Sequence, residues 1–500
     1  MSLSTALSIA ASGLGTYSRL SDIAANNIAN ADVEGFVRKE GSLSSVVRDG
    51  RGLGVALSDI LRHANPSLAR EARREGALGA FLDVQADALA AYAVELGQPS
   101  EGRSIAAALA RLEQAFISLA ETPESASLQR EAVHAAHAVT TALADLSASV
   151  RRLREDAELQ IQAEVEIVNQ SLGELERVND EIKLLAGTGR DVTALEDQRD
   201  RLIDTIAERI PVREIRRAPN DVLLLTEQGV PLFDGRPAVV GFTRTAGIAP
   251  AAIYEPGGAP DPGYAAVLSG LTIDGRDVAP GSGDAQAIAS GRIAGLFAVR
   301  DDLTVRLQKQ IDQLASALID RFQDPANDPS LAPGTPGLFT AGGMFHDRSS
   351  PAEIVGMADR IAVNLAVDPD QGGAAWRMRD GVGAAVPGPA GDATQLFRFL
   401  AAFDDTLTYP ADSGLAPTLS LRATGAELVS GQQSARAQAQ TQAERQAVVA
   451  DTLRDVRANA TGVNVDNELQ RMLQLEKSYA ANANVVQAAA RMLDELLSIA

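Results

Sequence analysis

The chain has 500 residues and a formal net charge of −21 at pH 7, with no cysteine and only 4% aromatic residues. Its length suggests more than one domain. The acidic balance argues against nucleic acid and anionic membrane surfaces as partners, because both are bound through Lys and Arg. A chain without cysteine forms no disulfide and has no thiol chemistry. Abundant alanine and few aromatic residues favour long helices over a thick aromatic core.

Two targeting features are not expected. No run approaches the ~20 consecutive apolar residues that span a bilayer. The first residues lack a basic start, a continuous apolar block and a small-residue cleavage site. We therefore expect neither membrane insertion nor a cleaved signal peptide.

Both ends of the chain carry a seam of apolar or small residues at alternating steps of four and three. The N-terminal seam is Leu3, Leu7, Ala10, Leu14, Tyr17, Ser21, Ala24 and Ile28. The C-terminal seam is Val465, Leu469, Met472, Glu476, Tyr479, Ala483, Val486, Ala490, Leu493 and Leu497. This spacing predicts two long helices that pack on each other as a coiled coil, with the rest of the chain inserted between them. Alanine buries little apolar area, so the pair is expected to become firm only when neighbouring copies cover it.

A turn is expected directly after the first helix. Asn26, Asn27 and Asn30 tolerate the left-handed conformation that ends a helix, and Gly35 suits the turn that follows. The spacing alone favours a simple helix stop.

The interior alternates between long helices and less regular segments. A short strand is expected near 55–60, after a glycine-rich turn. Apolar periodicity predicts helices over about 68–96, 105–119, 128–182, 195–210, 291–322 and 427–460, with helix also returning at 393. Short β-rich runs are expected at 222–225, 231–233, 239–242 and 267–273, and residues 324–392 are rich in Pro, Gly and Asp.

The expected fold is mainly α with an inserted β domain. Residues 1–60 and 461–500 would form the terminal coiled-coil domain, which polymerises. Residues 61–210, 291–323 and 393–460 would form a bundle of long helices. Residues 211–290 would form an outer β-rich domain, and residues 324–392 a loop-rich subdomain.

The sequence offers no convincing chemistry, and we predict no catalytic residue, cofactor or metal. His134 and His137 share a helix face, but a zinc site needs three or four organised ligands. The charged run 197–201 is interpreted as a surface face of ion pairs, each worth about 0–1 kcal/mol. An enzyme or metal-binding protein on a coiled-coil scaffold remains an alternative, which bound metal or turnover would reveal.

Three stretches carry a resemblance to a known family. The N-terminal stretch comprises Ser12-Gly13-Leu14, residues 26–30 and residues 35–38. The C-terminal stretch comprises residues 462–466, Glu468, Leu473, and residues 479–483, 492–493 and 496–497. The third stretch is residues 197–202. The ends resemble the signatures of the flagellar axial proteins, which are the bacterial rod, hook and hook-associated proteins. The length and the middle resemble the hook-associated proteins of the hook–filament junction. A hook, rod or flagellin-like protein is the alternative.

The resemblance implies a structural protein that joins hook to filament by helical self-assembly. Its implied partners are the hook protein, the next hook-associated junction protein, copies of itself in a ring, and an export chaperone on the C-terminal helix. It also implies export to the extracellular flagellum through the flagellar secretion system. Twelve residues are assigned to the assembly seam: Leu3, Leu7, Leu14, Tyr17, Ile28, Leu469, Met472, Leu473, Tyr479, Val486, Leu493 and Leu497.

Overall fold

The chain divides into two compact units, each built from separate stretches of sequence. The structure is a computed structural model that describes residues 3–48, 51–97, 102, 104–217 and 220–499. Unit 1 contains Met1–Ala77, Ile167–Ala238 and Ala447–Ala500, and unit 2 contains Leu78–Glu166 and Val239–Gln446. This division differs from the four expected domains, because unit 1 adds a middle segment of the chain to both ends.

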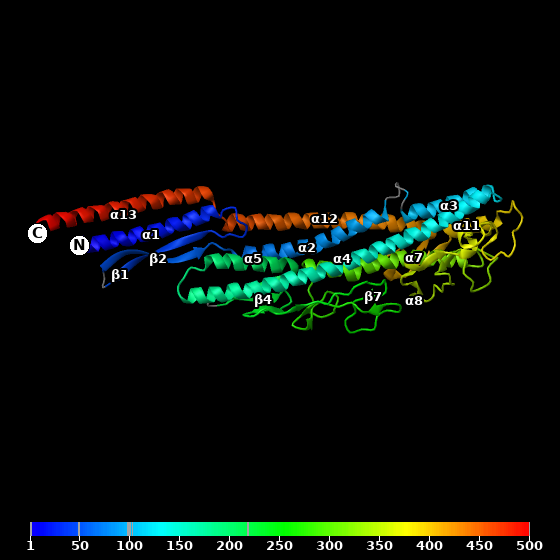
Figure 1. Ribbon diagram of the computed structural model, residues 1–500, viewed down its shortest axis with the longest axis horizontal. Coiled ribbons are helices and arrows are strands. Elements are labelled where there is room, and N and C mark those ends of the chain that lie inside the picture. The colour runs from blue at the N-terminus through cyan, green and yellow to red at the C-terminus, as the bar shows by residue number, and fades with distance from the viewer. Residues whose placement is uncertain (1–2, 49–50, 98–101, 103, 218–219, 500) are drawn as a thin grey trace. The chain divides into compact units, whose positions relative to one another are not determined.

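The two chain ends form an antiparallel helix pair in unit 1. Helix α1 (Leu3–Ala29) and helix α13 (Val465–Ile499) run side by side (Figure 1). Their direction follows from the contacts, because Gly13 faces Asn482 whereas Leu20 packs on Leu475, nearer the start of α13. The expected pairing of the terminal helices is confirmed.

A long β-hairpin follows α1. Strand β1 (Lys39–Arg48) pairs antiparallel with β2 (Arg51–Arg62), in a two-stranded sheet whose register shifts twice. The sequence predicted only a short part of β2. It did not predict β1, because this Ser-rich strand lacks a clear apolar alternation. A hydrogen bond from Thr16 to the carbonyl of Val55 and close packing around Gly41 fix the hairpin on α1. The lone two-stranded sheet therefore depends on α1 for its stability.

The remainder of unit 1 surrounds helix α5 (Thr193–Arg209). It comprises the start of α2 (Pro66–Leu96), the end of α4 (Ala126–Gly187), the end of α12 (Leu421–Thr461), and a sheet of β3 (Val212–Arg217), β4 (Asp221–Thr226) and β5 (Pro231–Asp234). Helix α4 ends at the helix break that the sequence predicted. In the turn that follows, Gly189 has a positive φ of 74°, a conformation that glycine adopts readily. Pro211 follows α5 and cannot donate a helical hydrogen bond.

Unit 2 is built mainly from helices with an aromatic core. Helix α3 (Ile105–Glu121) begins at Ser104, whose side chain accepts a hydrogen bond from the Ala107 amide. It packs with α11 (Thr394–Asp404) and α7 (Thr304–Gln323), and α7 continues from α6 (Arg292–Ala298) through a π-helical turn (Val299–Leu303). The core aromatic residues are Phe116, Phe322, Phe339, Phe399 and Phe403.

The β-rich part is divided into small sheets instead of one continuous sheet. Strands β3–β5 belong to unit 1, whereas unit 2 contains β6 (Val240–Gly241), β9 (Thr272–Ile273) and β10 (Arg276–Asp277) in one sheet and β7 (Ala252–Ile253) with β8 (Ala265–Ala266) in another. Arg154, on α4, holds this region by donating hydrogen bonds to the carbonyls of Ala249 and Ala252. Arg300 pairs with the buried Glu158 at 2.6 Å.

The loop-rich segment has little regular structure. It contains β11 (Phe339–Ala341) paired with β12 (Ile361–Val363), the short helices α8 (Pro351–Ile354), α9 (Met357–Arg360) and α10 (Arg377–Asp380), and 3₁₀ turns at Leu365–Val367 and Pro369–Gln371. Asp312 of α7 anchors the loop-rich segment by accepting hydrogen bonds from the amides of Gly356 and Ala358. A further hairpin, β13 (Thr406–Thr408) with β14 (Thr418–Ser420), was not expected.

The expectation that no segment could span a membrane needs one correction. Among the described residues, α2 alone is long and apolar enough to cross a membrane by length and composition. Of its most apolar window, 44% is buried in the protein. A single helix of this kind is weak evidence for a membrane span.

Candidate assembly site: the terminal helices and their charged anchor

The contact between α1 and α13 is narrow and made by small groups. Leu20, Ala24 and Leu475 form its buried cluster, with Tyr17 and Ile23 packed against them. At Gly13 the helices approach so closely that a Cβ would lie 2.6 Å from the Asn482 side-chain oxygen. The pair therefore buries little apolar surface, as the alanine-rich seams predicted.

The predicted seam residues of α1 lie beside this contact. Leu3, Leu7, Leu14, Tyr17 and Ile28 are all half-buried. The fully buried positions of α1 include Gly13, Thr16 and Asn27, which are small or polar. The burial of Gly13 and Thr16 was not expected, because the sequence was searched for apolar side chains, whereas Asn27 was predicted as a residue of the turn.

On α13 the predicted seam is largely uncovered. Met472 and Val486 are half-buried, whereas four of the predicted residues, Leu469, Leu473, Tyr479 and Leu493, are 38–58% exposed. The side chain of Leu497 lies outside the described residues.

The face of α13 that α1 and the adjoining turn cover is a different one. Among the described side chains of α13, the buried ones are Glu468, Leu475 and Ala489, whose positions differ by multiples of seven. The burial of Glu468 was not expected, because an acidic residue gives no apolar signal. A row of large apolar side chains on α13 is consequently free in the single chain.

The turn after α1 is held by its asparagines. Asn27 is fully buried, and its side chain both donates to the Lys39 carbonyl (2.8 Å) and accepts from the Lys39 amide (3.1 Å). Asn30 donates to the carbonyl of Asn26, whose own side chain is exposed. Gly35 has φ +75°, and a Cβ there would lie 2.8 Å from the Arg201 side chain. The Asn27 side chain thus pairs with both backbone polar groups of Lys39, at the start of β1.

Charged groups join the start of α13 to the hairpin. The Arg38 amide donates to the Thr461 carbonyl (2.8 Å), and its guanidinium contacts the buried Glu468 at 2.7 Å. Arg471 contacts Glu40 at 3.1 Å. Burial raises the pKa of Glu40, but the hydrogen bond from a histidine and the charges of the two arginines outweigh it and lower that pKa. Ion pairs therefore hold the start of α13 to the turn after α1 and to strand β1.

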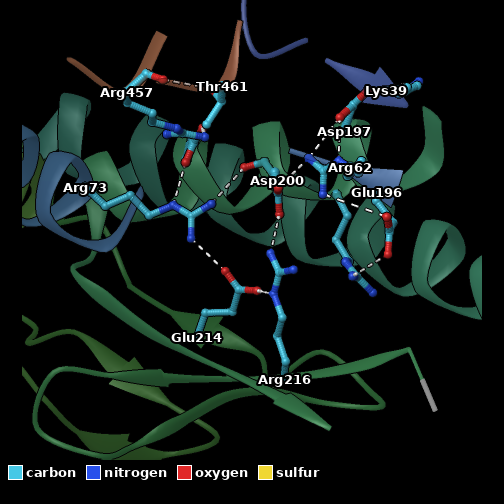
Figure 2. Close-up of polar contacts among 12 residues, drawn as sticks. Lys39, Arg62, Arg73, Glu196, Asp197, Asp200, Glu214, Arg216, Arg457 and Thr461 are labelled. Atoms are coloured by element: carbon cyan, nitrogen blue, oxygen red, sulfur yellow. Dashed lines mark hydrogen bonds and ion pairs between the residues drawn. The ribbon is translucent and has the colours of Figure 1, made fainter. Parts of the chain in front are cut away.

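A larger charged anchor lies on α5 (Figure 2). Asp197, Asp200 and Asp204 follow at helical spacing and share one face. Asp197 contacts Lys39 at 3.2 Å and Arg62 at 2.8 Å, and Arg62 also contacts Asp200 at 2.7 Å. Both strands of the hairpin are thus fixed to α5. Burial raises the pKa of Asp200, but Arg62 outweighs it and lowers that pKa.

The same face of α5 also binds α2, β3 and α12. Arg73 of α2 contacts Asp204 at 2.5 Å and Glu214 of β3 at 2.8 Å. Arg457 of α12 contacts Asp204 at 3.0 Å, and Arg216 contacts Glu214 at 2.8 Å (Figure 2). Burial lowers the pKa of Arg73, but the charges of its two carboxylate partners outweigh burial, so that the pKa lies above its ordinary value. The charged anchor therefore joins segments from both ends of the chain.

The interpretation of residues 197–201 as a surface face is wrong. Asp197, Arg199 and Asp200 are 2–6% exposed. Arg199 donates to the Asn220 carbonyl at 2.9 Å. The sequence could not reveal this, because Lys39 and Arg62, which neutralise Asp197 and Asp200, lie more than a hundred residues away along the chain.

The expectation of no metal site was tested against the histidines. His137 contacts Asp368 at 3.0 Å, as an isolated pair. Within the described ranges, no group of three or more His, Cys, Asp or Glu could hold a metal ion. The polar groups described above are arranged to pair with one another.

Three family models match the chain in the order of its parts. "Flagella basal body rod protein" matches residues 7–36, "Flagellar hook-associated protein FlgK helical domain" matches 98–328, and "Flagellar basal body rod FlgEFG protein C-terminal" matches 458–499. No curated protein sequence matches the chain.

Among solved structures, one similar chain is the flagellar hook junction protein FlgK from Burkholderia pseudomallei. It has 19% sequence identity and a TM-score of 0.42, over 55% of this chain and 47% of that chain. The match therefore spans about half the length of that protein.

The paired chain-end helices match rod-type models at both ends, as the ends of flagellar axial proteins do. Such proteins assemble with themselves and with other axial proteins as parts of the bacterial flagellum. The hook-associated helical domain between these ends makes the chain similar to the FlgK-like hook-associated proteins.

Proposed function

We propose that the chain is a structural, non-catalytic subunit that forms the junction between hook and filament, and that it assembles through α1 and α13. The observation that carries the proposal is the FlgK helical domain flanked by both rod-type terminal models. The exposed apolar row on α13 supports it, because surface apolar rows of this kind mark interaction sites. The resemblance to a hook junction protein agrees with this assignment.

The partners follow from a place between two tubes. Hook protein would contact one side, the next hook-associated protein the other, and copies of the chain would form the ring. An export chaperone would cover α13 before secretion, since its apolar row has no cover in the single chain. Export would proceed without a cleaved signal peptide. The net charge of −21 supports a role without nucleic acid or membrane insertion.

The expected division of labour among the domains is retained as part of this proposal. Residues 1–60 with 461–500 would polymerise. Residues 61–210, 291–323 and 393–460 would support them as a helical bundle. The assembly residues would be those of the predicted seam, and Asn26, Asn27, Asn30 and Gly35 would shape the turn that orients α1.

A charge-insertion experiment tests the function. A strain that lacks the chain should build hooks without filaments and release filament subunits into the medium. The wild-type chain should restore filaments, whereas Leu469→Asp/Leu473→Asp should not, because the change places two charges on the assembly row. Gln470→Asp/Gln474→Asp is the matched control, since it adds the same charge at exposed neighbouring positions.

Two results would contradict the proposal. A strain that lacks hooks altogether would favour a hook or rod protein. A leucine variant that restores filaments as well as the glutamine control would exclude α13 as an assembly surface. Circular dichroism of the purified variants separates failed assembly from failed folding.

A further inference from the structure

Unit 1 exposes apolar side chains on a second surface, the outer strand of the hairpin. Strand β2 provides most of the contacts of the hairpin with α1, so β1 is the outer strand. Leu43, Val46 and Val47 of β1 are 37–61% exposed. Among the described residues, no third strand pairs with the free edge of β1. A long, exposed, apolar edge strand tends to bind another chain.

The exposed row of α13 faces away from this hairpin. Arg471 marks the side of α13 toward the hairpin, because it contacts Glu40 of β1. Leu469 and Leu473 are two residues before and after it, and residues two apart lie on nearly opposite faces of a helix. We define Val465, Leu469 and Leu473, which follow at steps of four, as the α13 row.

One residue of each surface, Leu43 and Leu473, lies near the level of Leu20 on α1. Leu20 packs on Leu475 of α13 on one side. On its other side it contacts the hairpin around Gly41 and Leu57. Leu57 is the register partner of Leu43 in β1. Unit 1 thus has one apolar surface on each flank of α1, and the two surfaces extend in opposite directions from the level of Leu20.

We propose that the α13 row of one copy packs on the β1 surface (Leu43, Val46 and Val47) of the next copy. The occupant of each surface is a second copy of this chain, because each surface supplies what the other lacks. Two different surfaces on opposite flanks give a heterologous contact, which repeats around an axis instead of closing as a dimer. This inference rests on the proposed function, and it names the contact through which copies meet.

Cysteine cross-linking tests the contact, because the native chain contains no cysteine. Flagella carrying Leu43→Cys/Leu473→Cys would be treated with a short bis-maleimide and their denatured proteins separated by size. The double variant should give a ladder of cross-linked multimers, whereas either single variant should give monomers. Ser44→Cys/Gln470→Cys repeats the test at exposed polar neighbours and keeps every apolar side chain.

The outcomes separate the contact from the function beneath it. Filament-bearing flagella that contain either double variant but yield no ladder would overturn the contact and leave the proposed function standing. Dimers from Leu473→Cys alone would overturn it too, since α13 rows would then meet each other. If a strain lacking the chain builds normal filaments, the proposed function fails and this contact fails with it.

Discussion

The charged anchor makes a sharp prediction at two adjacent arginines of α2. Arg73 is buried and contacts Asp204 and Glu214, whereas Arg74 is exposed and contacts only Glu71 and Glu75. Replacing either by methionine removes one positive charge and keeps a long apolar side chain. The pair therefore isolates what burial adds to an ion pair.

The expected magnitudes differ severalfold. Removing one partner of a buried ion pair costs roughly 3–5 kcal/mol, because the other charge stays buried and unpaired. Asp204 keeps Arg457 and Glu214 keeps Arg216, so Arg73→Met should fall at or below the lower end, about 2–3 kcal/mol. The exposed pairs of Arg74 are worth about 0–1 kcal/mol.

Urea unfolding of the full chain would measure the difference, with hydrogen exchange on α5 peptides assigning it to unit 1. With a typical slope, a loss of about 2–3 kcal/mol lowers the midpoint of the unit 1 transition by about 1–2 M urea. Arg74→Met should leave that midpoint nearly unchanged. Equal midpoints for the two variants would refute the claim that the anchor stabilises unit 1.

Three further predictions concern single positions. Asn27→Ala should cost about 2–4 kcal/mol of unit 1 stability in urea unfolding, because it leaves the buried donor and acceptor of one backbone residue unpaired; equal loss in the exposed control Asn26→Ala would contradict this. Gly15→Ala should stabilise α1 by about 1 kcal/mol, measured by hydrogen exchange, whereas Gly13→Ala should gain less because its Cβ meets the partner helix; equal gains would contradict the close approach. Burial raises the pKa of Asp312 to about 7; its folded-state pKa exceeds the unfolded one, so its stabilisation is complete below about pH 4 and is lost as pH rises through 7. Asp312→Asn should flatten that part of the pH–stability profile, and an unchanged slope would contradict the assignment.

Helix periodicity predicted the long elements well because each stores its signal locally. The helix expected to start at Leu128 starts at Ala126, and the break after Gly187 lies where it was expected. The pattern at 105–119 likewise predicted α3. Strand β1 escaped notice because Ser42, Ser44 and Ser45 give no alternation, and because α1 covers only part of the hairpin.

The site itself was predicted only in part. Position and spacing identified the terminal helices and their weak seam, but assigned the buried face of α13 to its large apolar residues. The buried face instead uses Glu468 and Leu475, because Arg38 neutralises Glu468 from the turn after α1. No single-sequence pattern links two charges that are 430 residues apart. The burial of Asp197 and Asp200 was missed for the same reason.

Charge anchoring and apolar exposure in unit 1 have a common explanation. A helix pair held only by apolar burial would need Leu469 and Leu473 in its own contact, and would then have no apolar row for a neighbour. Here Arg38–Glu468 and Arg471–Glu40 fix the start of α13 instead. Ion pairs need specific partners, whereas apolar surface binds any complementary apolar surface. Charge therefore sets the position of α13 within the chain and leaves its apolar row uncovered in the single chain.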